Sequence, residues 1–163
     1  MVFGMPTLIE TESLEECAVL CKSLGLDFIE ISMSLPQYTN DSIDVSQFMS
    51  IAKKYDIFYT LHLDENVNFC DFNSYVSKAC VQYISDTIKL AKMLDVQIIN
   101  MHFYRGEHFT LPERKVDLFD IYKEHYLTKI LEFKNILSGK PPRKYTMSAV
   151  WIFCAADSLV SVK

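Results

Sequence analysis

Two apolar stretches that end in histidine place the strongest constraint on this chain of 163 residues. Residues 57–62 read Ile-Phe-Tyr-Thr-Leu-His, and residues 96–102 read Val-Gln-Ile-Ile-Asn-Met-His. Short runs rich in β-branched and aromatic residues are typical of buried strands, and a polar loop follows each run at once. We therefore predict two buried strands whose last residues, His62 and His102, mark the mouth of a functional site.

Strand patterns of this kind alternate with helical patterns along the chain. The predicted strands cover residues 1–6, 27–32, 57–62, 96–102 and 147–156. The predicted helices begin at or near Ser13, Asp44, Ser74 and Pro112, of which the first two are good N-caps and the last is a natural first helical residue. This order, βαβαβαβα with one further strand, predicts an α/β fold with a parallel sheet covered by helices.

Two parallel architectures fit this order of elements. A doubly wound sheet that binds a nucleotide has a glycine-rich first turn, and residues 6–13 contain no glycine. A (β/α)8 TIM barrel needs about 250 residues, so this chain is expected to form a partial barrel of four to five βα units. In both architectures the site lies at the C-terminal ends of the strands, where Glu30, His62 and His102 fall in the sequence.

Composition and charge narrow the class of protein. Half of the residues are apolar, and the longest apolar run, residues 149–156, is far below the roughly 20 residues of a membrane-spanning helix. The net charge is −5 and the basic residues form no stripe, which argues against a nucleic-acid partner. Five cysteines without close pairing, and no secretory leader pattern, favour reduced thiols in a cytoplasmic protein.

Four short segments resemble motifs of the xylose-isomerase-like TIM barrel superfamily, which contains sugar phosphate isomerases, epimerases and the endonuclease IV branch. They are residues 24–31 (Leu-Gly-Leu-Asp-Phe-Ile-Glu-Ile), 59–63 (Tyr-Thr-Leu-His-Leu), 88–95 (Ile-Lys-Leu-Ala-Lys-Met-Leu-Asp) and 96–102. The resemblance covers residues 1–137 and implies the N-terminal half of such a barrel. Residues 138–163 diverge, with a fifth strand expected at 147–156.

The resemblance also implies a site. His62 and His102 match the strand-three and strand-four histidines, which are metal ligands in the endonuclease branch and substrate-side groups in many isomerases. Glu30 matches a carboxylate that often faces the site, and it is the candidate catalytic group. Two imidazoles with a nearby carboxylate suit Mn, Zn or Co. The family adds a strand-five Glu and later Asp, His and Glu ligands, whereas residues 147–156 contain no acidic residue.

Each candidate also has a simpler interpretation. His62 and His102 could be core histidines that form hydrogen bonds with the neighbouring backbone. Glu30 could be a solvent-exposed side chain at the end of a strand. A buried carboxylate needs a partner, and His62 on the next strand is the expected one. Arg105 and His108, in the loop after residues 96–102, are candidates to bind a substrate phosphate or carboxylate. Ordinary solvated loop residues would look the same in the sequence.

These observations lead to three functional hypotheses. The first is a metal-dependent isomerase or epimerase of a sugar or sugar phosphate, in a truncated form. The second is a non-catalytic half-barrel that serves as an interaction module, and the third is an endonuclease IV-like phosphodiesterase. Because an open sheet exposes an edge at each end, we also expect self-association through those edges.

Overall fold

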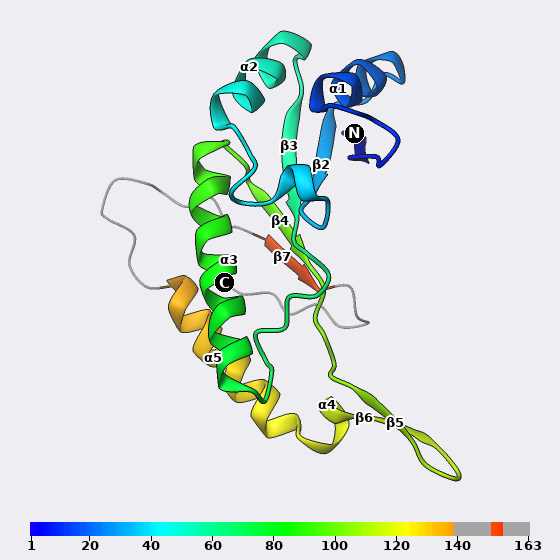
Figure 1. The fold of residues 1–163 in the computed structure, drawn as a ribbon, viewed down its shortest axis with the longest axis vertical. Helices are drawn as coiled ribbons and strands as arrows, with labels where there is room; N and C mark the ends of the chain where they lie inside the picture. The colour runs from blue at the N-terminus through cyan, green and yellow to red at the C-terminus, as the bar shows by residue number, and fades with distance from the viewer. Residues whose placement is uncertain (139–150, 155–163) are drawn as a thin grey trace.

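A five-stranded parallel sheet forms the centre of the protein (Figure 1). The structure is a computed structural model, and it describes residues 1–138 and 151–154. The strands lie in the order β1 (Gly4–Pro6), β2 (Phe28–Ser32), β3 (Phe58–His62), β4 (Ile98–Met101) and β7 (Trp151–Cys154). All neighbouring pairs in this sheet are parallel, which confirms the predicted sheet. Most of the divergent segment 138–163 lies outside the described residues, apart from β7.

Helices connect the strands and begin where the sequence provides caps. They are α1 (Leu14–Ser23), α2 (Val45–Tyr55), α3 (Ser74–Met93), α4 (Leu118–Ile121) and α5 (Lys123–Ser138), with a short 3-10 turn, η1 (Pro36–Tyr38). The Ser13 hydroxyl accepts a hydrogen bond from the backbone N–H of Glu16, and the Asp44 carboxylate accepts from Ser46 and Gln47. Both predicted N-caps are therefore confirmed. None of the helices in the described ranges is long and apolar enough to cross a membrane.

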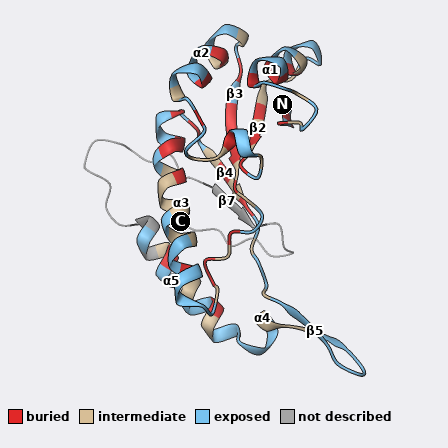
Figure 2. Ribbon diagram, in the orientation of Figure 1, coloured by how far each residue is buried: buried red, intermediate tan, exposed pale blue. Residues whose placement is uncertain are grey.

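The two faces of the sheet have different surroundings, because side chains alternate along each strand. One face packs under α1, α2 and α3 and is buried. Figure 2 shows the buried residues of β2 and β3 in red. Its strand residues are Ile29, Ile31, Tyr59, Leu61, Ile99 and Met101. The opposite face, here called the inner face, carries Phe28, Glu30, Ser32, Phe58, Thr60, His62, Ile98 and Asn100. Of these eight residues only Thr60 is buried.

One predicted element is wrong. We expected a helix from Pro112, but residues 108–117 form an antiparallel hairpin of β5 (His108–Thr110) and β6 (Lys115–Asp117). The backbone N–H of Leu111 donates to the carbonyl oxygen of Arg114 at 2.8 Å, which closes a tight turn with Pro112 at its second position. Proline is favoured at this turn position and also at the first position of a helix. Helical structure begins only at Leu118.

The N-terminal end of the inner face is closed by an aromatic pair. The rings of Phe28 and Phe58 stack with their centroids 5.1 Å apart. Gly4 lies opposite Phe28 in the neighbouring strand, and a Cβ atom added at Gly4 would overlap the Phe28 ring. The absence of a side chain at Gly4 therefore allows β1 to pair with β2 beside this ring.

Replacing Gly4 tests this packing. Because the added methyl group must displace the Phe28 ring, we expect Gly4→Ala to lower the free energy of unfolding by about 1–3 kcal/mol in urea titrations. The same change made in a Phe28→Ala background should cost much less, since the obstructing ring is gone. Equal costs in the two backgrounds would show that the Phe28 ring is not the cause.

Candidate functional site

The register of β2, β3 and β4 brings the polar side chains of the inner face together. Glu30 lies opposite Thr60 in the β2–β3 pair, and His62 lies opposite Asn100 in the β3–β4 pair. Residues two apart in a strand share a face, so Thr60 and His62 point to the same side of the sheet. The polar groups therefore gather at the C-terminal ends of three neighbouring strands.

The Glu30 carboxylate is held through one of its two oxygens. Its Oε2 atom accepts a hydrogen bond from Asn100 Nδ2 and a longer one, 3.4 Å, from the Thr60 hydroxyl. Thr60 lies on β3, the strand next to β2, and Asn100 lies on β4, one strand further, so groups from three strands meet at one side chain. His62, the expected partner, makes no hydrogen bond to Glu30 in the described part of the chain. In the β2–β3 pair His62 lies opposite Ser32, two residues after Glu30.

The two histidines lie next to one another just beyond this carboxylate. The ring centroids of His62 and His102 are 5.0 Å apart, and the ring planes are inclined by 55°. His62 Nδ1 lies 3.0 Å from the carbonyl oxygen of Leu63. With the proton on Nδ1, that contact is a hydrogen bond, and Nε2 keeps its lone pair for a ligand. His102 follows the last residue of β4 and is exposed.

These residues do not complete a catalytic metal centre within one chain. Three protein ligands with an open position are the usual minimum for such a site. Within residues 1–138 and 151–154, no group of three His, Cys, Asp or Glu side chains is placed to hold a metal ion. The described chain thus places two imidazoles side by side, while Glu30 is bonded to Asn100 and Thr60.

Arg105 lies in the loop after β4, and His108 is the first residue of the hairpin that follows this loop. The Arg105 guanidinium contacts Asp117 at 3.3 Å and Asp120 at 2.9 Å, and it lies over the ring of Phe119. It therefore fastens the base of the hairpin. His108 is exposed in β5, opposite Asp117. No hydrogen bond or ion pair in the described chain joins either residue to Glu30, His62 or His102, so their predicted substrate contacts stay a prediction.

Sequence reasoning did not identify Thr60 and Asn100 as site residues. A signal for them exists, because each stands two positions before one of the two histidines. Strand alternation places residues i and i+2 on one face. The pairs Thr60-x-His62 and Asn100-x-His102 therefore mark a polar face that continues toward Glu30.

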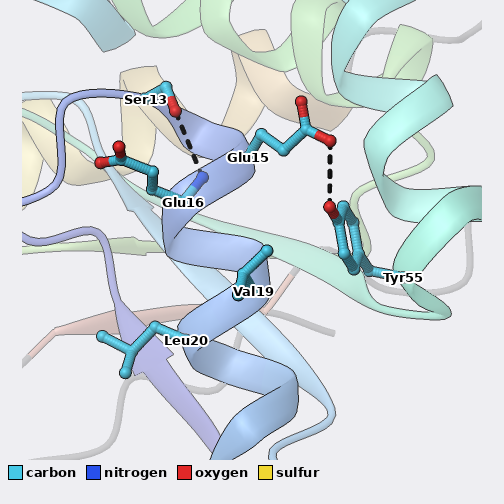
Figure 3. A pocket seen from close by; sticks show the side chains of 6 residues that line it. All are labelled: Ser13, Glu15, Glu16, Val19, Leu20 and Tyr55. Atoms are coloured by element: carbon cyan, nitrogen blue, oxygen red, sulfur yellow. Dashed lines mark hydrogen bonds between the residues drawn. The ribbon is translucent and has the colours of Figure 1, made fainter.

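A depression of about 440 Å³ lies elsewhere, between α1 and α2 (Figure 3). Residues from α1, its N-cap and the end of α2 line it: Ser13, Glu15, Glu16, Val19, Leu20 and Tyr55. The Lys54 ammonium and the Tyr55 hydroxyl both bond to Glu15 and lower the pKa of its carboxyl group. The second lining carboxylate, that of Glu16, accepts a hydrogen bond from the backbone N–H of Glu12. Because both carboxylates already have partners, this depression is a packing feature of two surface helices.

The hydrogen bond between Asn100 and Glu30 can be tested by replacing Asn100 with a negatively charged aspartate. We expect Asn100→Asp to lower the free energy of unfolding at pH 7 by about 1–3 kcal/mol, because a hydrogen bond to a charged group becomes a repulsion. Adding Glu30→Gln should recover most of that loss, since the glutamine amide can donate to the new aspartate. No recovery in the double variant would contradict the contact.

The role of Arg105 can be tested by hydrogen exchange. We expect Arg105→Ala to increase amide exchange across residues 107–118 while global stability changes by less than about 1 kcal/mol, since the ion pairs are partly exposed. Arg114→Ala is the matched control, because this arginine lies at the hairpin tip and makes no ion pair within the described residues. Equal exchange in both variants would contradict the fastening role.

Comparison with known proteins supports the fold alone. No family model and no curated protein matches the chain. Among solved structures, a D-tagatose 3-epimerase-like protein is 23% identical with a TM-score of 0.62, and the match covers 85% of this chain and 49% of that one. An L-ribulose 3-epimerase is 14% identical with a TM-score of 0.65, covering 94% and 49%. Endonuclease IV from Thermus thermophilus is 15% identical with a TM-score of 0.55, covering 86% and 48%.

The chain therefore spans about half the length of the structures that it matches. Its parallel sheet with alternating helices agrees with part of a barrel, as the sequence predicted. The structural neighbours of this chain are xylose-isomerase-like TIM barrel proteins, and it has the fold of a partial barrel of that kind.

Proposed function

We propose that this chain supplies one side of a site that isomerises or epimerises a sugar or sugar phosphate. The observation that carries the proposal is the carboxylate of Glu30, which two neighbouring strands hold at the strand ends beside a pair of imidazoles. Several structural neighbours are sugar epimerases, which makes a sugar a suitable substrate class. The net charge of −5 favours this class over the phosphodiesterase alternative.

The geometry suits proton transfer next to a carbonyl group. Asn100 and Thr60 bond to Oε2 of Glu30, and Oε1 makes no hydrogen bond within the described residues. In the proposed step, Oε1 takes a proton from the carbon beside the sugar carbonyl; the C–H bond breaks and its electron pair moves toward the carbonyl oxygen. Return of the proton to the other face, or to the neighbouring carbon, gives the epimer or the isomer.

His62 and His102 would contact the oxygen side of the substrate. A divalent ion such as Mn, Zn or Co, when bound, would polarise the carbonyl and the adjacent hydroxyl group. The two imidazoles would supply two of its ligands, but the described part of one chain supplies no group of three. We therefore assign to this chain only the binding of substrate oxygens and the proton transfer at Glu30.

One observation favours the second hypothesis, a non-catalytic interaction module. The same shortage of ligands within the described residues would leave a half-barrel that associates without turnover. Self-association through the two ends of the sheet fits either hypothesis. Binding of sugar or metal is the property that separates them.

A reducing, cytoplasmic location is proposed with this function. Cys17 and Cys21 are buried on α1 and form no disulfide. Burial raises the pKa of both thiols, which keeps them protonated.

Solvent-hydrogen exchange tests the proton-transfer step. The chain is incubated with D-fructose in D2O with and without Mn²⁺, and deuterium at the carbons next to the carbonyl is followed by NMR. We expect incorporation that Glu30→Gln lowers by at least about 100-fold, since general-base catalysis contributes about that much. Glu65→Gln, in an exposed loop, is the matched control and should keep the parent rate. No incorporation by the parent chain would contradict turnover of this sugar and favour the interaction module.

A further inference from the structure

We infer that Phe103 is a positioning residue, which holds His102 beside His62 because its ring anchors the loop after β4 among aromatic side chains of α4 and α5. The effect of Phe103 on turnover rests on the proposed function, since the histidine pair belongs to the proposed site. Its effect on the position of His102 does not, because that effect follows from hydrogen bonds and ring contacts alone.

Hydrogen bonds fix the two histidines to different degrees. The carbonyl oxygen of His62 accepts the backbone N–H of Met33 at 2.9 Å, and the next residue, Leu63, donates its N–H to the carbonyl oxygen of Asn100 at 2.9 Å. His62 Nδ1 also lies 3.0 Å from the carbonyl oxygen of Leu63. His102 lies one position beyond the end of β4, and none of the hydrogen bonds among residues 1–138 involves it. Something other than strand pairing with β3 therefore holds His102 in place.

Phe103, the residue directly after His102, is held by three other rings. Its ring centroid lies 5.7 Å from that of Phe119 and 6.1 Å from that of Tyr126. The third ring, Phe69, is 6.4 Å away. Edge-to-face contacts at these separations are favourable. Phe119 belongs to α4, Tyr126 to α5 and Phe69 to the loop after β3, so three segments of the chain surround the residue next to His102.

These rings belong to one packed unit, here called the aromatic cluster. Tyr126 is 1% exposed and Phe69 is 6% exposed. Phe69 also stacks on Phe133 of α5, with ring centroids 4.5 Å apart and an angle of 28° between the planes. The members of the cluster are Phe69, Phe103, Phe119, Tyr126 and Phe133. Because most of its contacts are buried, the cluster is a rigid support for the half-buried Phe103.

The loop after β4 is also fitted closely against this cluster. The backbone N–H of Phe119 donates to the carbonyl oxygen of Arg105 at 3.0 Å. Gly106 has a positive φ of 81°, and a Cβ atom added there would overlap the hydroxyl group of Tyr126. The absence of a side chain at Gly106 therefore allows the loop to lie directly on α5.

The aromatic cluster thus joins the two loops that leave the histidine pair. Phe69 lies in the loop after His62, and Phe103 begins the loop after His102. The ring centroids of the two histidines are 5.0 Å apart. Since His62 is fixed by hydrogen bonds and His102 is not among residues 1–138, loosening the cluster should move His102 and leave His62 in place.

NMR of the free protein tests this positioning role. In the parent chain we expect a nuclear Overhauser effect between the imidazole protons of His62 and His102. Phe103→Leu, which removes the ring contacts and keeps an apolar side chain, should abolish that effect and shift the His102 signals. Phe103→Tyr keeps the ring and should restore both. Circular dichroism confirms that each variant is folded.

Phe133→Leu is the matched control. It is the same change in the same cluster, at a residue that is only 6% exposed, but Phe133 contacts Phe69 and lies away from the residue next to His102. The nuclear Overhauser effect should survive in this variant. An equal loss in Phe103→Leu and Phe133→Leu would overturn a specific role for Phe103, and so would an unchanged effect in Phe103→Leu.

Gly106→Ala provides a second route to the same displacement. The added methyl group must push the loop away from Tyr126 although Phe103 is intact. We expect a weaker nuclear Overhauser effect between His62 and His102 in this variant as well. This measurement decides the question if Phe103→Leu does not fold, and an unchanged effect in Gly106→Ala would then overturn the inference.

Deuterium incorporation from D2O into D-fructose tests the consequence for turnover. We expect Phe103→Leu to lower the rate by about 100-fold at saturating D-fructose, since a displacement of about 1 Å at a reacting centre costs about that much. Phe133→Leu should keep the parent rate. A parent rate in Phe103→Leu despite a lost nuclear Overhauser effect would support the positioning role and contradict the part of His102 in the reaction. No incorporation by the parent chain would contradict the proposed function alone, because the NMR test uses no substrate.

Discussion

Parallel pairing of β2, β3 and β4 in one register is the constraint on which the whole site depends. That register sets Glu30 beside Thr60 and His62 beside Asn100. A shift of one residue in any pair would turn these polar side chains toward the helices and bring apolar residues to the inner face. The register is fixed by residues such as Ile29, Leu61 and Ile99, which are buried under the helices. Core packing on the helix-covered face therefore positions the polar side chains of the inner face.

Much of this arrangement can be predicted from the sequence because its signals are local. Ser13 and Asp44 cap helices by short-range hydrogen bonds, and apolar runs mark the strands. The order of elements then fixes a parallel sheet. Placing Glu30, His62 and His102 at neighbouring strand ends follows from the same order, since the C-terminal ends of parallel strands meet at one edge of the sheet.

Other features depend on contacts that no local pattern contains. Proline is favoured both in turns and at helix starts. Pro112 occupies a turn because β5 and β6 pair around it. The partner of Glu30 is Asn100, 70 residues away, because the strand register decides which donor reaches the carboxylate. Arg105 appears in the sequence as a free cation in a loop. Asp117 and Asp120 engage it only once the hairpin has formed.

In the proposed site His62 and His102 act as one binding unit, and they are two of the four histidines in the chain. His108 lies on the exposed hairpin, and His125 stacks on Phe72, so both serve as internal references. The direct measurement is a Mn²⁺ titration of the imidazole signals by NMR, in which a bound paramagnetic ion broadens nearby protons. If these two imidazoles bind as one unit, we expect His62 and His102 to broaden together at lower Mn²⁺ concentrations than His108 and His125. Equal broadening of all four, or broadening of His62 without His102, would contradict it.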